Sequence, residues 1–122
     1  MEEMRVKEWE SKSLRVVVDD LKKGWFWYSP GIPMAWGRAL EQVFGNMLDD
    51  IRVVEAVYRT WTTGYGPNFR YHYKLIIKVD RNVEELLKSR EARVLTAGDV
   101  IFGGTSKDIW FDGDTITLSA TY

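Results

Sequence analysis

The stretch that most constrains the fold is residues 68–79, whose sequence is NFRYHYKLIIKV. Apolar and basic residues alternate through its first half, and only Ile76 interrupts the pattern. Side chains of a β-strand point alternately to opposite faces, so this stretch predicts a strand with a core side and a basic side. The core side is expected to hold Phe69, Tyr71, Tyr73, Leu75 and Ile77, and the basic side Arg70, His72, Lys74 and Lys78.

The preceding residues predict the hairpin partner of this strand. Residues 51–61 (IRVVEAVYRTW) are rich in β-branched and aromatic side chains and have apolar residues on both faces. Such a composition indicates a strand near the centre of a sheet. The intervening TTGYGPN at 62–68 contains two glycines and a proline, which are typical of a turn. The two strands are therefore predicted to form an antiparallel hairpin.

Two segments are predicted to be helical. In residues 33–48, a proline suits the first turn, and two glycines, Gly37 and Gly45, indicate close packing against a sheet or fraying at the carboxyl end. In the second, shorter segment, Asn82 is followed three positions later by Glu85, a capping-box pattern that opens a helix. The apolar stripe of the first helix is expected to contain Trp36, Leu40, Val43, Phe44 and Met47.

Most of the remaining chain is predicted to form strands. Residues 13–20 (SLRVVVDD) place Leu14, Val16 and Val18 on one side, and residues 25–28 (WFWY) are predicted to be the partner strand. Residues 92–122 contain the short apolar runs ARVL, DVIF and DIWF and then the alternating run TITLSATY. Because TITLSATY ends the chain, it is expected to lie at a sheet edge that is open to pairing with another copy.

Short turns between strands favour an antiparallel sheet. The DGD at 112–114 is interpreted as such a turn, since Asp-Gly is a favoured turn pair, rather than as a calcium site. We therefore predict an α+β fold, in which a curved antiparallel sheet packs on one main helix and a short second helix lies at an edge.

Length and charge limit the range of functions. The 122 residues predict one α+β domain over 1–122, with 1–11 as a partly ordered tail that Trp9 pins. The chain has no cysteine, which excludes disulfides and thiol catalysis. Its net charge of −1 lacks the positive excess of a duplex-DNA binder, so a nucleic-acid contact would need a local basic patch. No apolar run approaches the ~18 residues of a membrane span, and we expect a cytoplasmic protein without membrane association.

Catalytic signals are weak. The chain has one histidine, no nucleophile or nucleotide-binding motif and no carboxylate spacing that predicts a metal site, so we expect no cofactor and no metal. The weak catalytic candidates are His72 as a base and Glu55 as the carboxylate that orients it. The competing interpretation is an ion pair between Glu55 and a cross-strand cation. A non-catalytic domain is favoured, and a small cofactor-independent enzyme with a carboxylate in an aromatic-lined pocket is an alternative.

Aromatic residues favour a binding or assembly role. Six tryptophans in so short a chain exceed what its core needs, and excess Trp and Tyr mark interfaces, so a homo-oligomer is expected. Stacking groups with interleaved cations on an open sheet bind single-stranded nucleic acid, which is the leading partner hypothesis, followed by an acidic protein surface. The candidate binding residues are Trp25, Trp27, Arg59, Trp61, Arg70, His72 and Lys74.

Overall fold

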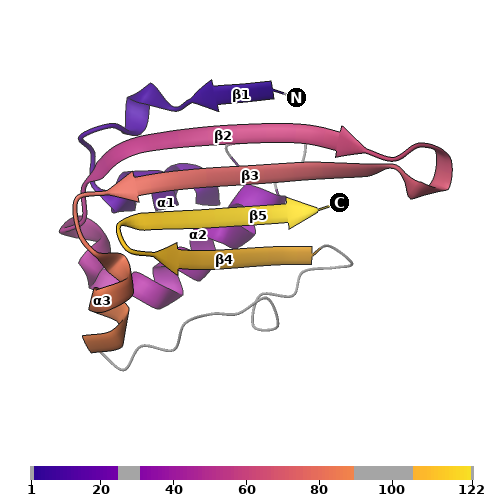
Figure 1. Ribbon diagram of the computed structural model, residues 1–122. Coiled ribbons are helices and arrows are strands. Elements are labelled where there is room, and N and C mark those ends of the chain that lie inside the picture. Colours follow the sequence, from indigo (N-terminus) through magenta and orange to yellow (C-terminus); the bar gives the residue numbers. More distant parts are fainter. Residues whose placement is uncertain (1, 25–30, 90–105, 122) are drawn as a thin grey trace.

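The predicted hairpin forms the middle of the sheet. In the computed structural model, which describes residues 2–24, 31–89 and 106–121, strand β2 (Val53–Thr63) pairs antiparallel with β3 (Arg70–Val79) (Figure 1). The short 3-10 helix η3 (Gly66–Asn68) lies in the loop between them. Their register sets Trp61 opposite His72.

Three shorter strands complete the described sheet. Strand β1 (Glu2–Arg5) pairs with β2, while β5 (Thr115–Thr121) pairs with β3 and with β4 (Ser106–Asp112), which gives the order β1-β2-β3-β5-β4. All neighbours are antiparallel, and the predicted α+β fold is confirmed. The prediction of an edge at residues 115–122 is wrong, because β4 folds back along the outer side of β5 after the turn at Gly113.

Helices cover one face of the sheet. The main helix, α2 (Gly31–Phe44), is extended by the 3-10 helix η2 (Gly45–Asp49), and it packs beside α1 (Leu14–Lys22) (Figure 1). The prediction of a strand over residues 13–20 is therefore wrong. The physical reason is visible in the burial pattern: Leu14, Val17, Val18 and Leu21 are buried at helical spacing, whereas Val16 is exposed. The strand predicted for residues 25–28, with Trp25 and Trp27, lies outside the described residues, as do the runs ARVL and DVIF.

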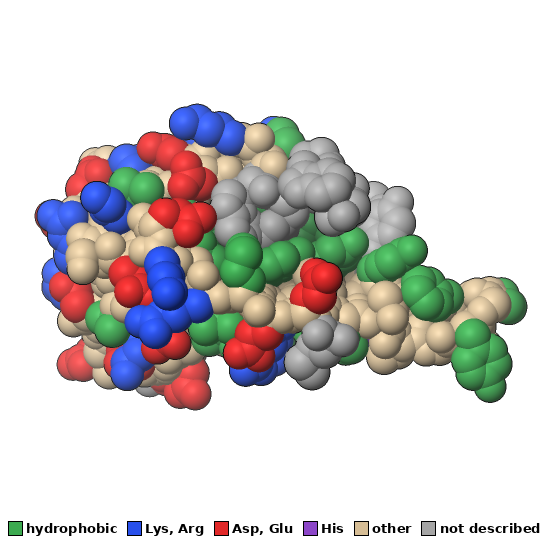
Figure 2. All heavy atoms as spheres, turned by 90° about the horizontal axis from the view of Figure 1, so that it is seen from above, with side chains coloured by type: hydrophobic (Ala, Val, Ile, Leu, Met, Phe, Trp, Pro, Cys, Tyr) green, Lys and Arg blue, Asp and Glu red, His purple; other side chains and the backbone are tan. Residues whose placement is uncertain are grey.

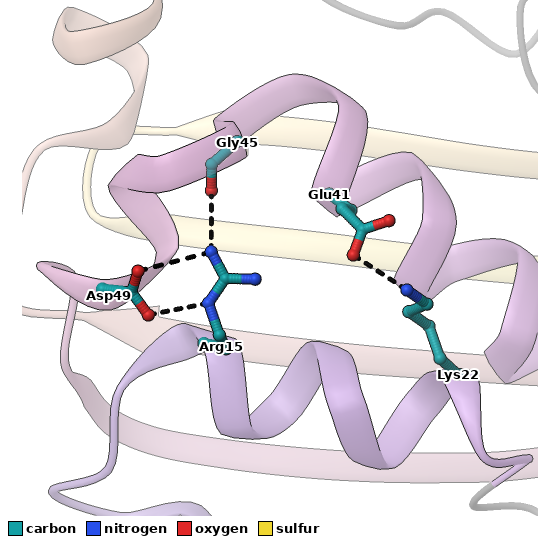
Figure 3. Close-up of polar contacts among 5 residues, drawn as sticks. All are labelled: Arg15, Lys22, Glu41, Gly45 and Asp49. Carbon is teal, nitrogen blue, oxygen red and sulfur yellow. Dashed lines mark hydrogen bonds and ion pairs between the residues drawn. The ribbon is translucent and has the colours of Figure 1, made fainter.

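Polar contacts connect α1 to α2 and η2 along their length. Arg15 Nε donates to Asp49 Oδ1 at 2.7 Å, and Lys22 Nζ donates to Glu41 Oε2 at 2.8 Å (Figure 3). The hydrogen bond from Lys22 lowers the pKa of the Glu41 carboxyl, and the bond to Asp49 raises the pKa of Arg15. These pairs are exposed, so each contributes little to the stability of the fold.

Gly37 allows α1 and α2 to approach closely. A Cβ built at this position would lie 2.8 Å from Lys22 Cγ and 3.1 Å from Val18 O, both in α1. The close packing predicted from this glycine is therefore made against a helix rather than the sheet. Gly45 adopts a φ of 52° where α2 ends, a conformation that favours glycine.

The core lies between the helix layer and the sheet. Trp36 and Leu40 of α2 are buried in the same cluster as Leu75 of β3, and the ring of Phe44 meets that of Phe111 in β4 edge-on, with centroids 5.6 Å apart. The alternation predicted for the last strand is confirmed within the described residues. Its buried side consists of Ile116, Leu118 and Ala120.

The N-terminal segment, predicted as a partly ordered tail, forms the edge strand β1 and the 3-10 helix η1 (Lys7–Trp9). Trp9 is fully buried, and its Nε1 donates to Asp20 Oδ2 of α1 at 2.8 Å. At the other edge, helix α3 (Val83–Ser89) lies beside β4. Its predicted cap is confirmed, since the backbone N–H of Glu85 donates to Asn82 Oδ1 at 3.0 Å.

Candidate binding face of the sheet

The face of the sheet that points away from α1 and α2, here called the open face, is not covered by a helix within the described residues (Figure 1). Residues that oppose each other in antiparallel strands share a face, so the register assigns side chains to it. From β2 it receives the odd-numbered residues 55–63, and from β3 the even-numbered residues 70–78. All of these side chains are partly or fully exposed.

An aromatic stack lies on this face. The rings of Trp61 and His72 are 5.0 Å apart between centroids and 9° from parallel. Both nitrogens of the His72 ring have hydroxyl partners: Thr63 Oγ1 lies 2.7 Å from Nε2, and Thr121 Oγ1 lies 3.2 Å from Nδ1. Because a hydroxyl group can donate or accept, the two threonines hold the ring in place whether it is neutral or protonated.

Cations surround the stack. Arg59 lies directly opposite Lys74. Along β3, Arg70 lies two residues before His72, and Lys74 lies two residues after it. Arg70 Nη1 donates to the backbone oxygen of Phe69 at 2.9 Å, which turns its guanidinium toward the loop. The structure thus brings Arg59, Trp61, Arg70, His72 and Lys74 onto one face.

Charge on the open face is locally positive although the whole chain is not. Arg59 Nε donates to Glu3 Oε2 of β1 at 2.9 Å, so one cation already has an anionic neighbour. Among the described side chains, five basic groups share the open face with three acidic ones: Arg5, Arg59, Arg70, Lys74 and Lys78, against Glu3, Glu55 and Asp112.

Sequence reasoning missed one residue of the face. Trp110 of β4 is 49% exposed and lies opposite Thr117, which is itself opposite Ile76. Three strand spacings across the sheet and four residues along it separate Trp110 from Trp61, a distance of roughly 20 Å. A signal was present, because the core residues Ile109 and Phe111 on either side of Trp110 force it to the opposite face.

The two weak catalytic candidates are not brought together. Glu55 lies opposite Lys78, six residues along β3 from His72, which amounts to roughly 20 Å. An irregularity in the register between Val53 and Glu55 leaves Val53 in the core and Glu55 on the open face. The pKa of the nearby Arg5 is raised, mainly by its hydrogen bond to Glu10 and to a smaller degree by the charge of Glu55. Glu55 therefore lies opposite Lys78 and near Arg5.

Other features of the described residues do not point to a further chemistry. A shallow hollow near α3 is lined by Arg81, Asn82, Glu85 and Leu86 and contains neither Glu55 nor His72. Within residues 2–24, 31–89 and 106–121, no group of three His, Asp or Glu side chains is arranged to hold a metal ion. Every helix in the same ranges is too short or too polar to cross a membrane.

Comparisons of this chain with protein-family models, with curated proteins and with solved structures found no match. The geometry of the open face is therefore the basis on which a function can be proposed.

Proposed function

We propose that this protein binds single-stranded nucleic acid on the open face of its sheet. The observation that carries the proposal is the parallel Trp61–His72 stack on an uncovered face, with Arg70 and Lys74 on either side of it along β3. Bases of any sequence can stack on such rings, while phosphates are attracted to the cations between them.

The spacing of the face suits an extended strand. Alternate residues of β3 that point to the same side, such as Arg70, His72 and Lys74, are ~7 Å apart, from the ~3.4 Å rise per residue. Successive phosphates of an extended single strand can match this distance. Trp110 provides a second aromatic side chain at the far edge of the same face. A strand that reaches both tryptophans would cross the sheet diagonally.

The charge of the chain favours a single strand over a duplex. A net charge of −1 gives little long-range attraction for a duplex, whose charge density is high. Contact with three or four phosphates would give log K a slope of about −2 to −3 against log salt concentration, from ~0.7 per phosphate for single strands. Binding should therefore be moderate and sensitive to salt.

Fluorescence anisotropy of labelled DNA and RNA 12-mers, single-stranded and duplex, tests the proposal. Trp61→Ala is expected to weaken single-strand binding by about 1–3 kcal/mol, and Trp61→Phe to restore much of it. Lys74→Gln should weaken binding and reduce the salt slope by about 0.7. Lys23→Gln, which removes an exposed charge at the end of α1 on the other side of the sheet, is the matched control and should change little.

A failure to bind any single-stranded oligonucleotide at low salt would overturn the proposal. The second candidate is then an acidic protein surface, which the same five cations would attract without the aromatic stack. The two variants distinguish the two partners. Trp61→Ala, which removes the stack, should weaken binding of nucleic acid, whereas Lys74→Gln, which removes a charge, should weaken binding of either partner.

A further inference from the structure

The β2–β3 hairpin projects beyond the rest of the sheet. Toward the tip of the hairpin, the last described pair between β1 and β2 is Glu2 with Thr60. The last described pair between β3 and β5 is His72 with Thr121. Residues 62–71, here called the arm, pair only with each other in the described sheet and extend past β1, β4 and β5 (Figures 1 and 2). Two strands without further support are marginally stable in water, so an arm of this kind gains stability when it docks.

The end of the arm is aromatic. Tyr65 is 87% exposed, Tyr71 is 48% exposed and Phe69 is 39% exposed, and the rings of Phe69 and Tyr71 meet edge-on with centroids 4.9 Å apart. Figure 2 shows hydrophobic side chains gathered along the arm. Clustered exposed aromatic side chains mark protein interfaces, where tyrosine is strongly enriched.

The tip has a defined shape rather than a free one. Gly64 has a φ of 74°, and a Cβ built there would clash with the backbone oxygen of Asn68. The chain therefore closes tightly on itself before the turn of η3 and presents Tyr65 outward. A preformed tip loses less conformational entropy on binding than a flexible loop would.

Charge indicates what the arm would meet. Residues 56–79 of the hairpin contain four Lys or Arg residues and His72 and no carboxylate, while Glu55 lies just before them in β2. Of these cations, Arg70 is the one within the arm. At the opposite end of the sheet, the connections at residues 49–52, 80–85 and 112–114 contain seven carboxylates and two arginines. The arm thus has Arg70 and no carboxylate, whereas carboxylates predominate at the far end, here called the acidic end.

Hydrogen bonds join the three connections into one surface. The backbone N–H of Asp80 donates to the oxygen of Arg52 at 2.9 Å, and the backbone N–H of Gly113 donates to Glu84 Oε2 at 3.0 Å. The hollow lined by Arg81, Asn82, Glu85 and Leu86 lies at this acidic end. It combines the apolar side chain of Leu86 with a carboxylate, an amide and the guanidinium of Arg81, a lining that suits a tyrosine ring and its hydroxyl.

We propose that the arm of one copy docks at the acidic end of a second copy, with Tyr65 in the hollow beside Glu85. Such a contact uses two different surfaces of the same chain, so it is a head-to-tail interface that closes into rings or continues as filaments. The attraction between Arg70 of the carboxylate-free arm and the acidic end favours this orientation, and the aromatic tip supplies apolar contact area. The assembly does not depend on nucleic-acid binding and is measured without it.

Sedimentation velocity over a concentration series, in nucleic-acid-free protein, tests this interface. Wild-type protein is expected to associate, and Tyr65→Ser and Glu85→Lys should each weaken the association at least tenfold. Two matched controls lie on α1, on the helix side of the molecule, and should leave association unchanged: Val16→Ser, which removes another exposed apolar side chain, and Asp19→Lys, which makes the same charge change as Glu85→Lys.

Mixing the two interface variants gives the sharper result. Tyr65→Ser retains an intact acidic end and Glu85→Lys an intact arm, so a one-to-one mixture should form dimers and nothing larger. A symmetric interface that used either surface alone would not be rescued in this way. Thermal melting curves identify a variant that has lost its fold, in which case Phe69→Ser and Glu85→Gln take the place of the original pair.

Two outcomes would overturn the proposal. One is a wild-type protein that stays monomeric at hundreds of micromolar and low salt. The other is association that both variants leave intact, or that their mixture fails to restore. If Tyr65→Ser weakens oligonucleotide binding in a monomeric wild-type background, the arm contacts nucleic acid instead, and the head-to-tail assembly is wrong.

Discussion

Glu3→Gln should strengthen nucleic-acid binding, an effect opposite to that of most surface substitutions. Glu3 lies on the edge strand β1, opposite Arg59, and its carboxylate accepts a hydrogen bond from Arg59 Nε at 2.9 Å. A phosphate that approaches the open face must compete with this carboxylate for the guanidinium and is repelled by it. Glutamine keeps the shape of the side chain and removes the charge.

The magnitude follows from the exposure of the pair. Both side chains are about half exposed, and ion pairs in such positions contribute about 0.2–1 kcal/mol. Repulsion between the carboxylate and a phosphate some 7 Å away adds roughly 0.6 kcal/mol in water. Since part of each contribution is lost to salt screening, we expect a net gain of about 0.6–1 kcal/mol, which is a threefold to fivefold tighter complex.

Anisotropy titrations of a labelled single-stranded 12-mer at two salt concentrations measure this gain. Asp19→Asn is the matched control, because it changes the net charge by the same amount from an exposed position on α1, behind the sheet. We expect the control to change the affinity by less than half as much. Equal effects of the two variants would show that only net charge matters, and weaker binding by Glu3→Gln would refute the open face as the binding site.

Three further predictions concern the fold. Trp9→Ala should lower the free energy of unfolding by about 3–5 kcal/mol in urea titrations, because it empties a fully buried site; a loss as small as that of the exposed Lys7→Ala would restore the tail interpretation. Gly37→Ala should cost roughly 1 kcal/mol, since overpacking against Lys22 outweighs the gain in helix propensity, whereas Gly31→Ala, with open space around its Cβ, should cost nothing by the same titration. Burial raises the pKa of the Tyr58 hydroxyl above its usual value of about 10. The stability that this group contributes is therefore present below pH ~10 and is lost as the pH rises further. Tyr58→Phe should flatten this alkaline loss of stability in melting curves, and an unchanged pH profile would contradict the assignment.

Local patterns were sufficient for much of the architecture. The period-two alternation of residues 68–79 predicted the strand and its two faces, because each side chain of a strand reverses direction relative to its neighbour. The predicted core side is correct for Tyr73, Leu75 and Ile77, which are buried. It is wrong for Phe69 and Tyr71, which are exposed where the hairpin extends past the rest of the sheet. The stripe of α2 was predicted from its helical spacing, and the cap at Asn82 from the position of Glu85 three residues later. In each case the decisive interaction lies within four residues along the chain, or repeats often enough to fix the period.

The failure at residues 13–20 shows the limit of such patterns. Three consecutive valines suit a strand by propensity, and Leu14, Val16 and Val18 alternate as a strand requires. Leu14, Val17, Val18 and Leu21 fit a helix equally well. Packing against α2 decided between the two, because the helix buries four apolar side chains on one side while Val16 remains exposed.

Local patterns likewise predicted one part of the candidate site, and tertiary packing decided the other part. The sequence placed Arg70, His72 and Lys74 on one face of their strand by alternation alone, and it named Arg59 and Trp61 as neighbours that only the register could align with them. The order of the strands decided the rest: it put Glu3 beside Arg59, brought Trp110 onto the open face and placed β5, which was expected at an edge, in the interior of the sheet. Which strands become neighbours depends on contacts between residues far apart in the chain. The free energy that favours these contacts comes from the apolar surface that the whole sheet buries against its helices, and this buried surface cannot be read from any single segment.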